Sequence, residues 1–434
     1  MADLSSIAQH RDRVLALARP KVCRNVPLDR AYGHVLAGDA RAILANPIFD
    51  NSAMDGFALH GADVAGSGPW VLPVAGDIPA GALRITSPPG HAVRVMTGAP
   101  VPPGEDILVV PVEQTDVPAG PQALPEQITV RTVDLNRSHI RPAGGKHAAG
   151  VVVAATGTRV DAGTLAALTS AGVQAVDVYA RPTVAVISTG DELVPWPDVP
   201  GASQLPDSNL PMIAELAAEN GAAEVRRFHS GDRGKGLAEL LDEASVCDVI
   251  VTTGGISAGA FDVVREVVAP RQGSWFGPVA QRPGTPQGVA SWGEATLVCL
   301  PGNPVAAYVS FLLYVAPLLA VLGTGNRAAQ AFRSIRAVAG PGFAAMRKGH
   351  SLVVPVRLSD EDGSTVAVPF STGAHNSSDV TALTGIDGFT IIKPVVDGAA
   401  EGTTEDGTAR VAAPAEGEPL LVHLLGRSNT GQWQ

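Results

Sequence analysis

The chain has 434 residues, a net charge of −11 and only 4% aromatic residues, together with 48 glycines and 35 prolines. Its length exceeds what one hydrophobic core usually supports, so we expect three or four domains. The acidic balance and the lack of a Lys/Arg run argue against nucleic acid as a partner. Three widely spaced cysteines fit a reducing cytoplasm, and an N-terminus without a basic start or apolar stretch predicts no secretion signal.

Hydrophobic spacing along the chain predicts a multidomain α/β protein. Residues 4–19 have the spacing of a helix, whereas short β runs broken by proline and glycine follow from about residue 46. Strands then alternate with helices from residue 181, which is typical of a domain built on a central parallel sheet. The expected domains are a discontinuous helical/linker domain, an inserted β domain, the α/β domain and a C-terminal β-barrel-like domain: residues 1–45 with 142–180, 46–141, 181–327 and 328–434.

One uncharged stretch is long enough to cross a bilayer. Val305 to Gly323 contains 19 residues without a charge. Pro317 interrupts the stretch, and no basic residue flanks it on the N-terminal side. A membrane span is therefore the weaker alternative, and we expect a helix buried behind the sheet, followed by a second helix that starts near Pro317.

Three glycine-marked turns follow three apolar, β-branched runs. Because each turn precedes a helix-compatible stretch, all three should lie at one rim, at the carboxyl ends of parallel strands. Ligands of open α/β sheets bind at this rim, where glycines allow close approach and helix N-termini attract anions. Carboxylates on the same loops indicate a phosphate compound held with a divalent cation. The turns are Thr189-Gly190-Asp191-Glu192, Gly254-Gly255-Ile256-Ser257-Ala258-Gly259 and Pro301-Gly302-Asn303-Pro304, and the carboxylates are Asp191, Glu192 and Asp262.

A second dense patch of polar residues lies at the start of the predicted β domain. Asp50 to Asp55 contains two carboxylates, an amide and a hydroxyl among small residues, and Gly56 follows. Ordinary turn chemistry explains this composition without any site, and composition alone favours that explanation by roughly two to one. The loop from Met96 to Gly104 carries one hydroxyl, Thr97, and by itself indicates only a rigid loop.

Five motifs occur in order along nearly the whole chain: Asp50-Asn51-Ser52-Ala53-Met54-Asp55-Gly56, Met96-Thr97-Gly98, Ser188-Thr189-Gly190-Asp191-Glu192-Leu193, Thr252-Thr253-Gly254-Gly255-Ile256-Ser257 and Leu300-Pro301-Gly302-Asn303-Pro304-Val305. In order and spacing they resemble the molybdopterin molybdotransferases, the MoeA family that includes the E domain of gephyrin. The resemblance implies an L-shaped homodimer of four-domain subunits, with a MogA-like, molybdopterin-binding α/β domain. It implies an active cleft between the β domain of one subunit and the sheet and C-terminal domains of the other. The implied reaction inserts molybdate into adenylylated molybdopterin and releases AMP, with Mg²⁺ needed.

The same resemblance assigns roles to individual residues. Asp55, Glu192 and Asp262 would hold the metal or orient water, Thr97 would line the cleft, and N–H groups of the second turn would cradle the pterin phosphate. For Asp262 an N-cap of the following helix is nearly as good an explanation, and Asp191 is equally well a turn residue. The implied catalytic residues are Asp55, Thr97, Glu192 and Asp262, and the implied substrate-binding residues are Gly190, Asp191, Gly254, Gly255, Ser257, Gly259, Arg282, Pro301, Gly302, Asn303, Pro304, Arg357, Ser377 and Ser378.

The chain departs from the family pattern at positions that the resemblance assigns to molybdate. Arg282-Pro283-Gly284-Thr285-Pro286 stands where many members have Lys-Pro-Gly-Lys-Pro, and Ala306 stands where they have serine. Pro355 falls where an arginine is usual, but Arg357 lies two residues on, on the same side of a strand, and can take its place. Losing a lysine and a hydroxyl weakens an anion site by about 2–4 kcal/mol, roughly 30- to 1000-fold in affinity.

The leading interpretation is a cytoplasmic, homodimeric molybdotransferase that completes the molybdenum cofactor. The adenylyltransferase that makes its substrate and the molybdoenzymes that receive its product are the expected partners. The altered positions 285, 306 and 355 keep two alternatives open, a non-catalytic or low-turnover pterin-binding paralogue and a variant that uses tungstate. A third interpretation is a pterin adenylyltransferase, because residues 181–325 resemble those single-domain enzymes, although the attached β domains argue against it.

Overall fold

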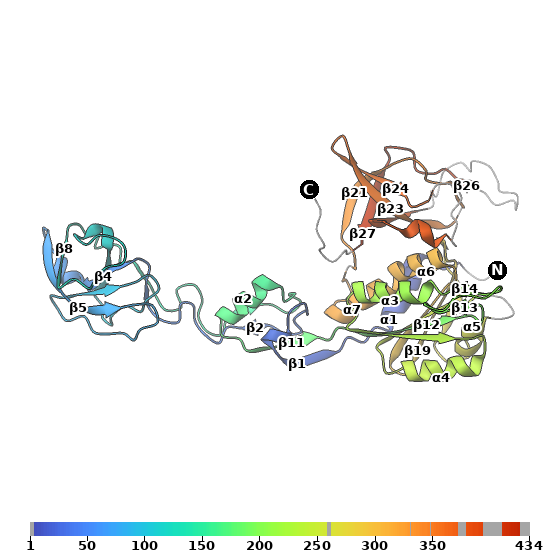
Figure 1. Cartoon of the computed structure of the whole chain (residues 1–434), viewed down its shortest axis with the longest axis horizontal. Coiled ribbons are helices and arrows are strands. Elements are labelled where there is room, and N and C mark those ends of the chain that lie inside the picture. The colour runs from blue at the N-terminus through green and yellow to red at the C-terminus, as the bar shows by residue number, and fades with distance from the viewer. Residues whose placement is uncertain are drawn as a thin grey trace. The chain divides into compact units, whose positions relative to one another are not determined.

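The computed structural model describes residues 4–257, 262–329, 331–347, 349–371, 379–393 and 410–425. The chain forms two compact units, coloured along the sequence in Figure 1. We call residues 24–177 the inserted unit, and residues 1–23 with 178–434 the sheet-and-barrel unit. The finer division into four domains stays a prediction.

The inserted unit has a five-stranded sheet in the order β7-β4-β6-β5-β8. Alternate side chains of β4 enter different cores, since Phe57 and Leu59 pack on one face and Ala58 packs on the other. Because both faces are covered, β4 is buried at nearly every position. The strands are β4 (Gly56–His60), β5 (Trp70–Ile78), β6 (Ala92–Val95), β7 (Ile107–Pro111) and β8 (Gln127–Val130).

The rest of the inserted unit consists of short strand pairs, three 3₁₀ turns and one α-helix, α2. Asp161 caps this helix, because its side chain accepts a hydrogen bond from the Thr164 N–H at 2.8 Å. Two-stranded pairs join β1 to β11, β2 to β10 and β3 to β9. The bounds are α2 (Ala162–Ser170), β1 (Val22–Pro27), β2 (Ala40–Arg41), β3 (Asn51–Ser52), β9 (Ile140–Arg141), β10 (Val152–Ala154), β11 (Ala175–Tyr179), η1 (Leu28–Arg30), η2 (Gly61–Val64) and η3 (Val112–Gln114).

The sheet-and-barrel unit is built on a six-stranded sheet in the order β15-β12-β16-β20-β19-β17. The first four strands are parallel, as predicted, and β19 and β17 add an antiparallel edge. The central strands β16 and β20 are buried at every position, which is why they read as continuous apolar runs. The strands are β12 (Thr183–Thr189), β15 (Glu224–Ser230), β16 (Val249–Thr253), β17 (Trp275–Pro278), β19 (Pro286–Trp292) and β20 (Ala295–Leu300).

Helices cover both faces of this sheet (Figure 1). Ile187 of β12 packs with α4 and α5 on one face, whereas its neighbour Val186 packs with α3 and α6 on the other. The chain thus buries two apolar layers, one on each side of the sheet. The helices are α3 (Asn209–Glu219), α4 (Gly234–Ala244), α5 (Val263–Val268) and α6 (Pro304–Ser310).

The uncharged stretch forms one helical run, Pro304–Thr324, with a mean hydropathy of 2.3. It is the one described helix that is long and apolar enough to cross a membrane, and 89% of its apolar window is buried inside the fold. Its middle, η4 (Phe311–Val315), is π-helical, and Pro317 lies in the first turn of α7 (Ala316–Thr324), where the missing N–H is tolerated. The predicted buried helix is confirmed. Helix α1 (Ile7–Ala16) packs against η4 and α7.

A second sheet follows in the order β18-β23-β24-β21-β27-β25, and a further pairing of β23 with β25 closes it into a barrel. The fold therefore has the central parallel sheet and the two small β regions that the sequence predicts. The remaining strands form the pairs β13 with β14 and β22 with β26. The bounds are β13 (Leu193–Val194), β14 (Leu205–Pro206), β18 (Gln281–Arg282), β21 (Ser334–Ala339), β22 (Met346–Arg347), β23 (Ser351–Glu361), β24 (Ser364–Pro369), η5 (Val380–Leu383), β25 (Gly388–Ile392), β26 (Arg410–Val411) and β27 (Pro419–Leu424).

Candidate functional site

A pocket of about 800 Å³ lies at the carboxyl ends of β12, β16 and β20. All three predicted turns line it, although long stretches of sequence separate them. Connections between parallel strands cross over the sheet, and successive turns therefore meet at the same edge. The predicted residues that line the pocket are Gly190, Glu192, Gly254, Gly255, Ser257, Asp262, Pro301, Gly302, Asn303 and Pro304.

The first turn places the Glu192 carboxylate in the pocket lining, whereas Asp191 lies outside the lining. Gly190 has a φ of +146°, and a Cβ there would lie 2.6 Å from Glu192 Oε2, so the Glu192 carboxylate lies close over the glycine. Asp191 instead accepts a hydrogen bond from the Asp232 N–H through Oδ1 at 3.1 Å. Its own N–H donates to Asp232 Oδ2 at 3.4 Å. These bonds are those of a turn residue, which was one of the two roles expected for Asp191.

The second and third turns depend on glycine because their backbones nearly touch. Gly254 has a φ of +93°, and a Cβ on it would lie 2.9 Å from Thr189 Oγ1. A Cβ on Gly302 would lie 3.3 Å from the Gly254 Cα. Glycine therefore permits both the conformation and the close approach of the three turns. Gly259 lies outside the described residues.

Asp262 lines the pocket and also stands at the start of α5. It occupies the N-cap position, but its side chain makes no capping hydrogen bond there. A capping hydrogen bond, which was the structural alternative to a functional role for Asp262, therefore does not position its carboxylate. Glu192 and Asp262 are the two predicted metal ligands that the pocket brings together.

Sequence reasoning missed a second group of polar residues in the pocket, namely Asp207, Ser208, Asn209 and Asp232. The Asp207 side chain is 1% exposed, and its Oδ1 accepts a hydrogen bond from the Leu210 N–H at 3.0 Å. Its Oδ2 lies 4.0 Å from His229 Nδ1 and has no hydrogen-bond partner, and neither has Asn209 Oδ1. Buried acceptors without a donor are costly, so this wall suits a ligand that presents N–H or O–H groups.

The sequence Asp207-Ser208-Asn209 could have signalled these residues, but it also fits an ordinary helix start. Asp207 does cap α3, because its Oδ1 accepts a hydrogen bond from the Leu210 N–H. Asn209 additionally donates from Nδ2 to the Gly302 carbonyl at 2.7 Å, which ties α3 to the third turn. Only burial, which the sequence does not show, distinguishes a helix cap from a residue that also lines the pocket.

The wall predicted to bind the oxyanion is formed by Gly284, Pro286 and Ala306. Thr285 donates its hydroxyl to the Gln281 carbonyl at 3.1 Å, and it is absent from the lining, as is Arg282. Ser377 and Ser378, also predicted to bind substrate, lie outside the described residues.

Arg357, the expected substitute for the missing arginine, is held by backbone carbonyls. Its guanidinium donates to Phe370 O at 3.3 Å, Ala382 O at 2.9 Å and Thr384 O at 2.8 Å. These bonds join β23 to η5 and to the segment that follows it. In this arrangement Arg357 orders the edge of the barrel, and its role toward an oxyanion stays a prediction.

Asp55 and Thr97 contact each other in the inserted unit. Asp55 Oδ1 accepts hydrogen bonds from the Thr97 N–H at 2.6 Å and from the Thr97 hydroxyl at 2.8 Å. These two bonds, the backbone one foremost, lower the pKa of the Asp55 carboxyl below the usual value for aspartate. Gly56 beside it is required, because a Cβ there would lie 2.0 Å from the Val110 carbonyl oxygen.

The site fits a magnesium ion bound mainly through substrate rather than an all-protein metal cage. Among the described residues, no group of three or more His, Cys, Asp and Glu side chains is arranged to hold a metal ion. Glu192 and Asp262 supply two carboxylates to one pocket. Mg²⁺ is commonly bound by one or two carboxylates, with substrate phosphates and water completing the shell.

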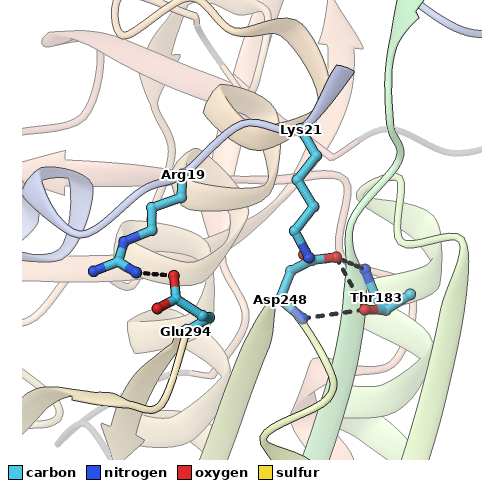
Figure 2. Close-up of polar contacts among 5 residues, drawn as sticks. All are labelled: Arg19, Lys21, Thr183, Asp248 and Glu294. Atoms are coloured by element: carbon cyan, nitrogen blue, oxygen red, sulfur yellow. Dashed lines mark hydrogen bonds and ion pairs between the residues drawn. The ribbon is translucent and has the colours of Figure 1, made fainter. Parts of the chain in front are cut away.

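The opposite rim of the sheet carries a charged cluster whose groups neutralise one another (Figure 2). Lys21 Nζ lies 2.6 Å from Asp248 Oδ1, and Asp248 Oδ2 accepts from the N–H and hydroxyl of Thr183 at 2.8 and 2.9 Å. Arg19 pairs with Glu294 beside them. This cluster fastens the N-terminal segment to the amino ends of the strands, so we assign it to stability.

Two family models cover most of the chain. Residues 5–172 match the MoeA N-terminal region (domain I and II), and residues 185–321 match the probable molybdopterin-binding domain. Two crystal structures of the molybdopterin biosynthesis MoeA protein from Pyrococcus horikoshii superpose with TM-scores of 0.79 and 0.69, over 98% and 97% of this chain and 100% of each neighbour. At 24% and 22% identity, these likenesses show the fold.

Curated relatives carry the same assignment at higher identity. Molybdopterin molybdenumtransferase 2 of Mycobacterium tuberculosis is 40% identical over 331 residues, which cover 73% of this chain and 79% of the relative. Molybdopterin molybdenumtransferase of Staphylococcus epidermidis is 35% identical over 299 residues, or 68% of this chain and 70% of the relative. These matches confirm the resemblance that the five motifs indicated, and the chain belongs to the molybdopterin molybdenumtransferases, transferases of molybdenum cofactor biosynthesis.

Proposed function

We propose that this chain inserts molybdate into adenylylated molybdopterin and releases AMP in an Mg²⁺-dependent step. The observation that carries the proposal is the pocket in which three glycine turns, the carboxylates of Glu192 and Asp262, and the buried acceptor oxygens of Asp207 and Asn209 converge. Backbone N–H groups of the turns suit the phosphate, and the acceptors of Asp207 and Asn209 suit the N–H groups of a pterin ring.

Each residue then has a task that its surroundings support. Glu192 and Asp262 would hold Mg²⁺, which when bound neutralises charge that develops on the phosphates. The ionised Asp55, fixed by Thr97, would orient the attacking water or oxyanion. In the proposed homodimer, Asp55 reaches the pocket from the partner subunit, as the family resemblance implies.

The direct test is AMP release by the purified protein with adenylylated molybdopterin and Mg²⁺, in the presence of molybdate, tungstate or neither. Release that depends on molybdate supports the proposal. AMP release with tungstate but not with molybdate would identify tungstate as the oxyanion substrate. Tight pterin binding without release under either oxyanion would contradict turnover and favour a non-catalytic paralogue.

A specific observation favours keeping the low-turnover paralogue as a second candidate. The Thr285 hydroxyl, where the family pattern has a lysine, is engaged by the Gln281 carbonyl, so it does not replace the missing cation. Restoring charge and hydroxyl with Thr285→Lys and Ala306→Ser should tighten molybdate binding. An unchanged affinity would show that these positions do not face the oxyanion.

The assembly, compartment and partners belong to the same proposal. We expect a homodimer, so light scattering should give twice the 44.3 kDa mass of the chain. An active monomer would rule out a cleft shared between subunits. We also propose a cytoplasmic location, with the molybdopterin adenylyltransferase supplying the substrate and molybdoenzymes receiving the product.

A further inference from the structure

A buried polar network lies directly beneath the turn Arg282–Pro286, which contributes Gly284 and Pro286 to the pocket wall. It consists of the side chains of Gln281, Gln287, Ser310 and Tyr314, each at most 1% exposed. Polar groups at such depth are costly unless they are hydrogen-bonded, so their arrangement indicates a definite role. None of the four lines the pocket, and none belongs to the motifs that mark the site.

Both amide groups of the network converge on one hydroxyl. Gln281 Nε2 donates to Ser310 Oγ at 3.1 Å, and Gln287 Nε2 donates to the same oxygen at 2.8 Å. The same nitrogens also donate to carbonyls of the turn, to Pro283 O at 3.1 Å and Gly284 O at 2.7 Å. Each glutamine therefore bridges the turn to the end of α6.

The far end of the network is fixed by the helical core. Tyr314 donates its hydroxyl to Gln281 Oε1, and the tyrosine ring is fully buried in η4. Ser310 is the last residue of α6, so both anchors belong to the buried run Pro304–Thr324. A rigid element thus sets where the two amides stand.

The turn Arg282–Pro286 packs closely against this network. Gly284 has a φ of +92°, and a Cβ there would lie 3.0 Å from both Gln281 Nε2 and Ser310 Oγ. Gly284 and Pro286 form the pocket wall with Ala306, which precedes Ser310 by one helical turn. The position of the wall is therefore coupled to the hydroxyl beneath it.

We propose that Ser310 is a positioning residue that holds the Arg282–Pro286 turn in the conformation that binds the oxyanion. The inference rests on the proposed function, which assigns this wall to molybdate. Ser310→Ala leaves two buried amide N–H groups without their shared acceptor, and the turn shifts or loosens. We expect the KM for molybdate to rise about tenfold, while kcat and the KM for adenylylated molybdopterin change less than about threefold.

The test compares three variants with the wild-type homodimer. Ser310→Ala removes the hydroxyl, and Ser310→Thr keeps it and should restore the molybdate KM. Thr390→Val is the matched control, because Thr390 is also a buried hydroxyl but donates to Leu421 O of the barrel at 2.9 Å rather than to the network beneath the turn. Molybdate-dependent AMP release gives the kinetic constants, and amide hydrogen exchange over residues 279–288 reports the turn without requiring activity.

The two readouts separate failure of this inference from failure of the proposed function. Faster exchange across the turn in Ser310→Ala, with a raised molybdate KM and rescue by threonine, supports the positioning role. Exchange equal to wild type, or a molybdate KM raised equally in Thr390→Val, overturns it. If the wild type releases no AMP with any oxyanion, the proposed function fails, and the exchange rates still decide whether Ser310 holds the turn.

Discussion

His10 makes the stability of the sheet-and-barrel unit depend on pH. Its ring is 0% exposed and lies against Trp275 and Tyr314, with ring centroids 4.8 and 4.5 Å apart. Neither ring nitrogen has a hydrogen-bond partner. Burial, helped by the nearby positive charge of Arg13, lowers the pKa of His10 from 6.5 to about 3.

The direction of the pH effect follows from proton binding in the two states. Below pH 6.5 the unfolded chain protonates His10, whereas the folded chain keeps it neutral until about pH 3. The unfolded state therefore binds more protons, and the free energy of unfolding falls as the pH drops through this window. At no more than about 1.4 kcal/mol per pH unit, this residue removes about 2 kcal/mol between pH 7 and pH 5.

The assay is urea unfolding followed by tryptophan fluorescence at pH 7 and pH 5. His10→Phe should lose about 2 kcal/mol less than wild type between these two values, because phenylalanine has no proton to bind. His147→Gln, at a partly exposed histidine, keeps the wild-type dependence because His10 is still present. Equal losses in wild type and His10→Phe would refute a buried, neutral His10.

Three further changes test other parts of the chain. Asp55→Ala should abolish AMP release and leave pterin binding near normal in a binding assay, and parallel loss of both would contradict a catalytic role. Asp248→Asn should lower the free energy of unfolding in urea by about 1 kcal/mol, because the ion pair with the largely exposed Lys21 is lost, and an unchanged midpoint would contradict this. Gly254→Ala should weaken pterin binding at least about tenfold in the same binding assay, because its Cβ would meet Thr189; wild-type affinity would show that the turn can adjust.

The sequence predicted those parts of the site that depend on local backbone chemistry. Gly190, Gly254 and Gly302 mark turns after buried strands, and the crossover rule for parallel strands brings such turns to one rim. The buried helical run was predictable from its lack of charge. The family resemblance, and not composition, singled out Asp55 and Thr97, whereas their hydrogen bonds to each other are visible only in the structure.

Residues that act through burial or distant contacts could not be predicted in this way. Asp207 fits a helix cap in sequence, and only the structure shows a carboxylate oxygen enclosed without a donor. Gln281 and Gln287 are ordinary polar residues in sequence, and Ser310 lies in an apolar helix. Their convergence requires a helix and a turn that are neighbours only after folding.

The pairing of β18 with β23 limits how this protein can be divided. Gln281 and Arg282 pair with Ser351 and Leu352 of the barrel, and a few residues later Pro286 begins β19 of the central sheet. The short segment from Gln281 to the start of β19 therefore takes part in two sheets. A fragment that contains only the α/β part would lose the pairing of β18 with β23, which supports the pocket wall. The barrel is therefore needed for an intact pocket and cannot be exchanged independently of it.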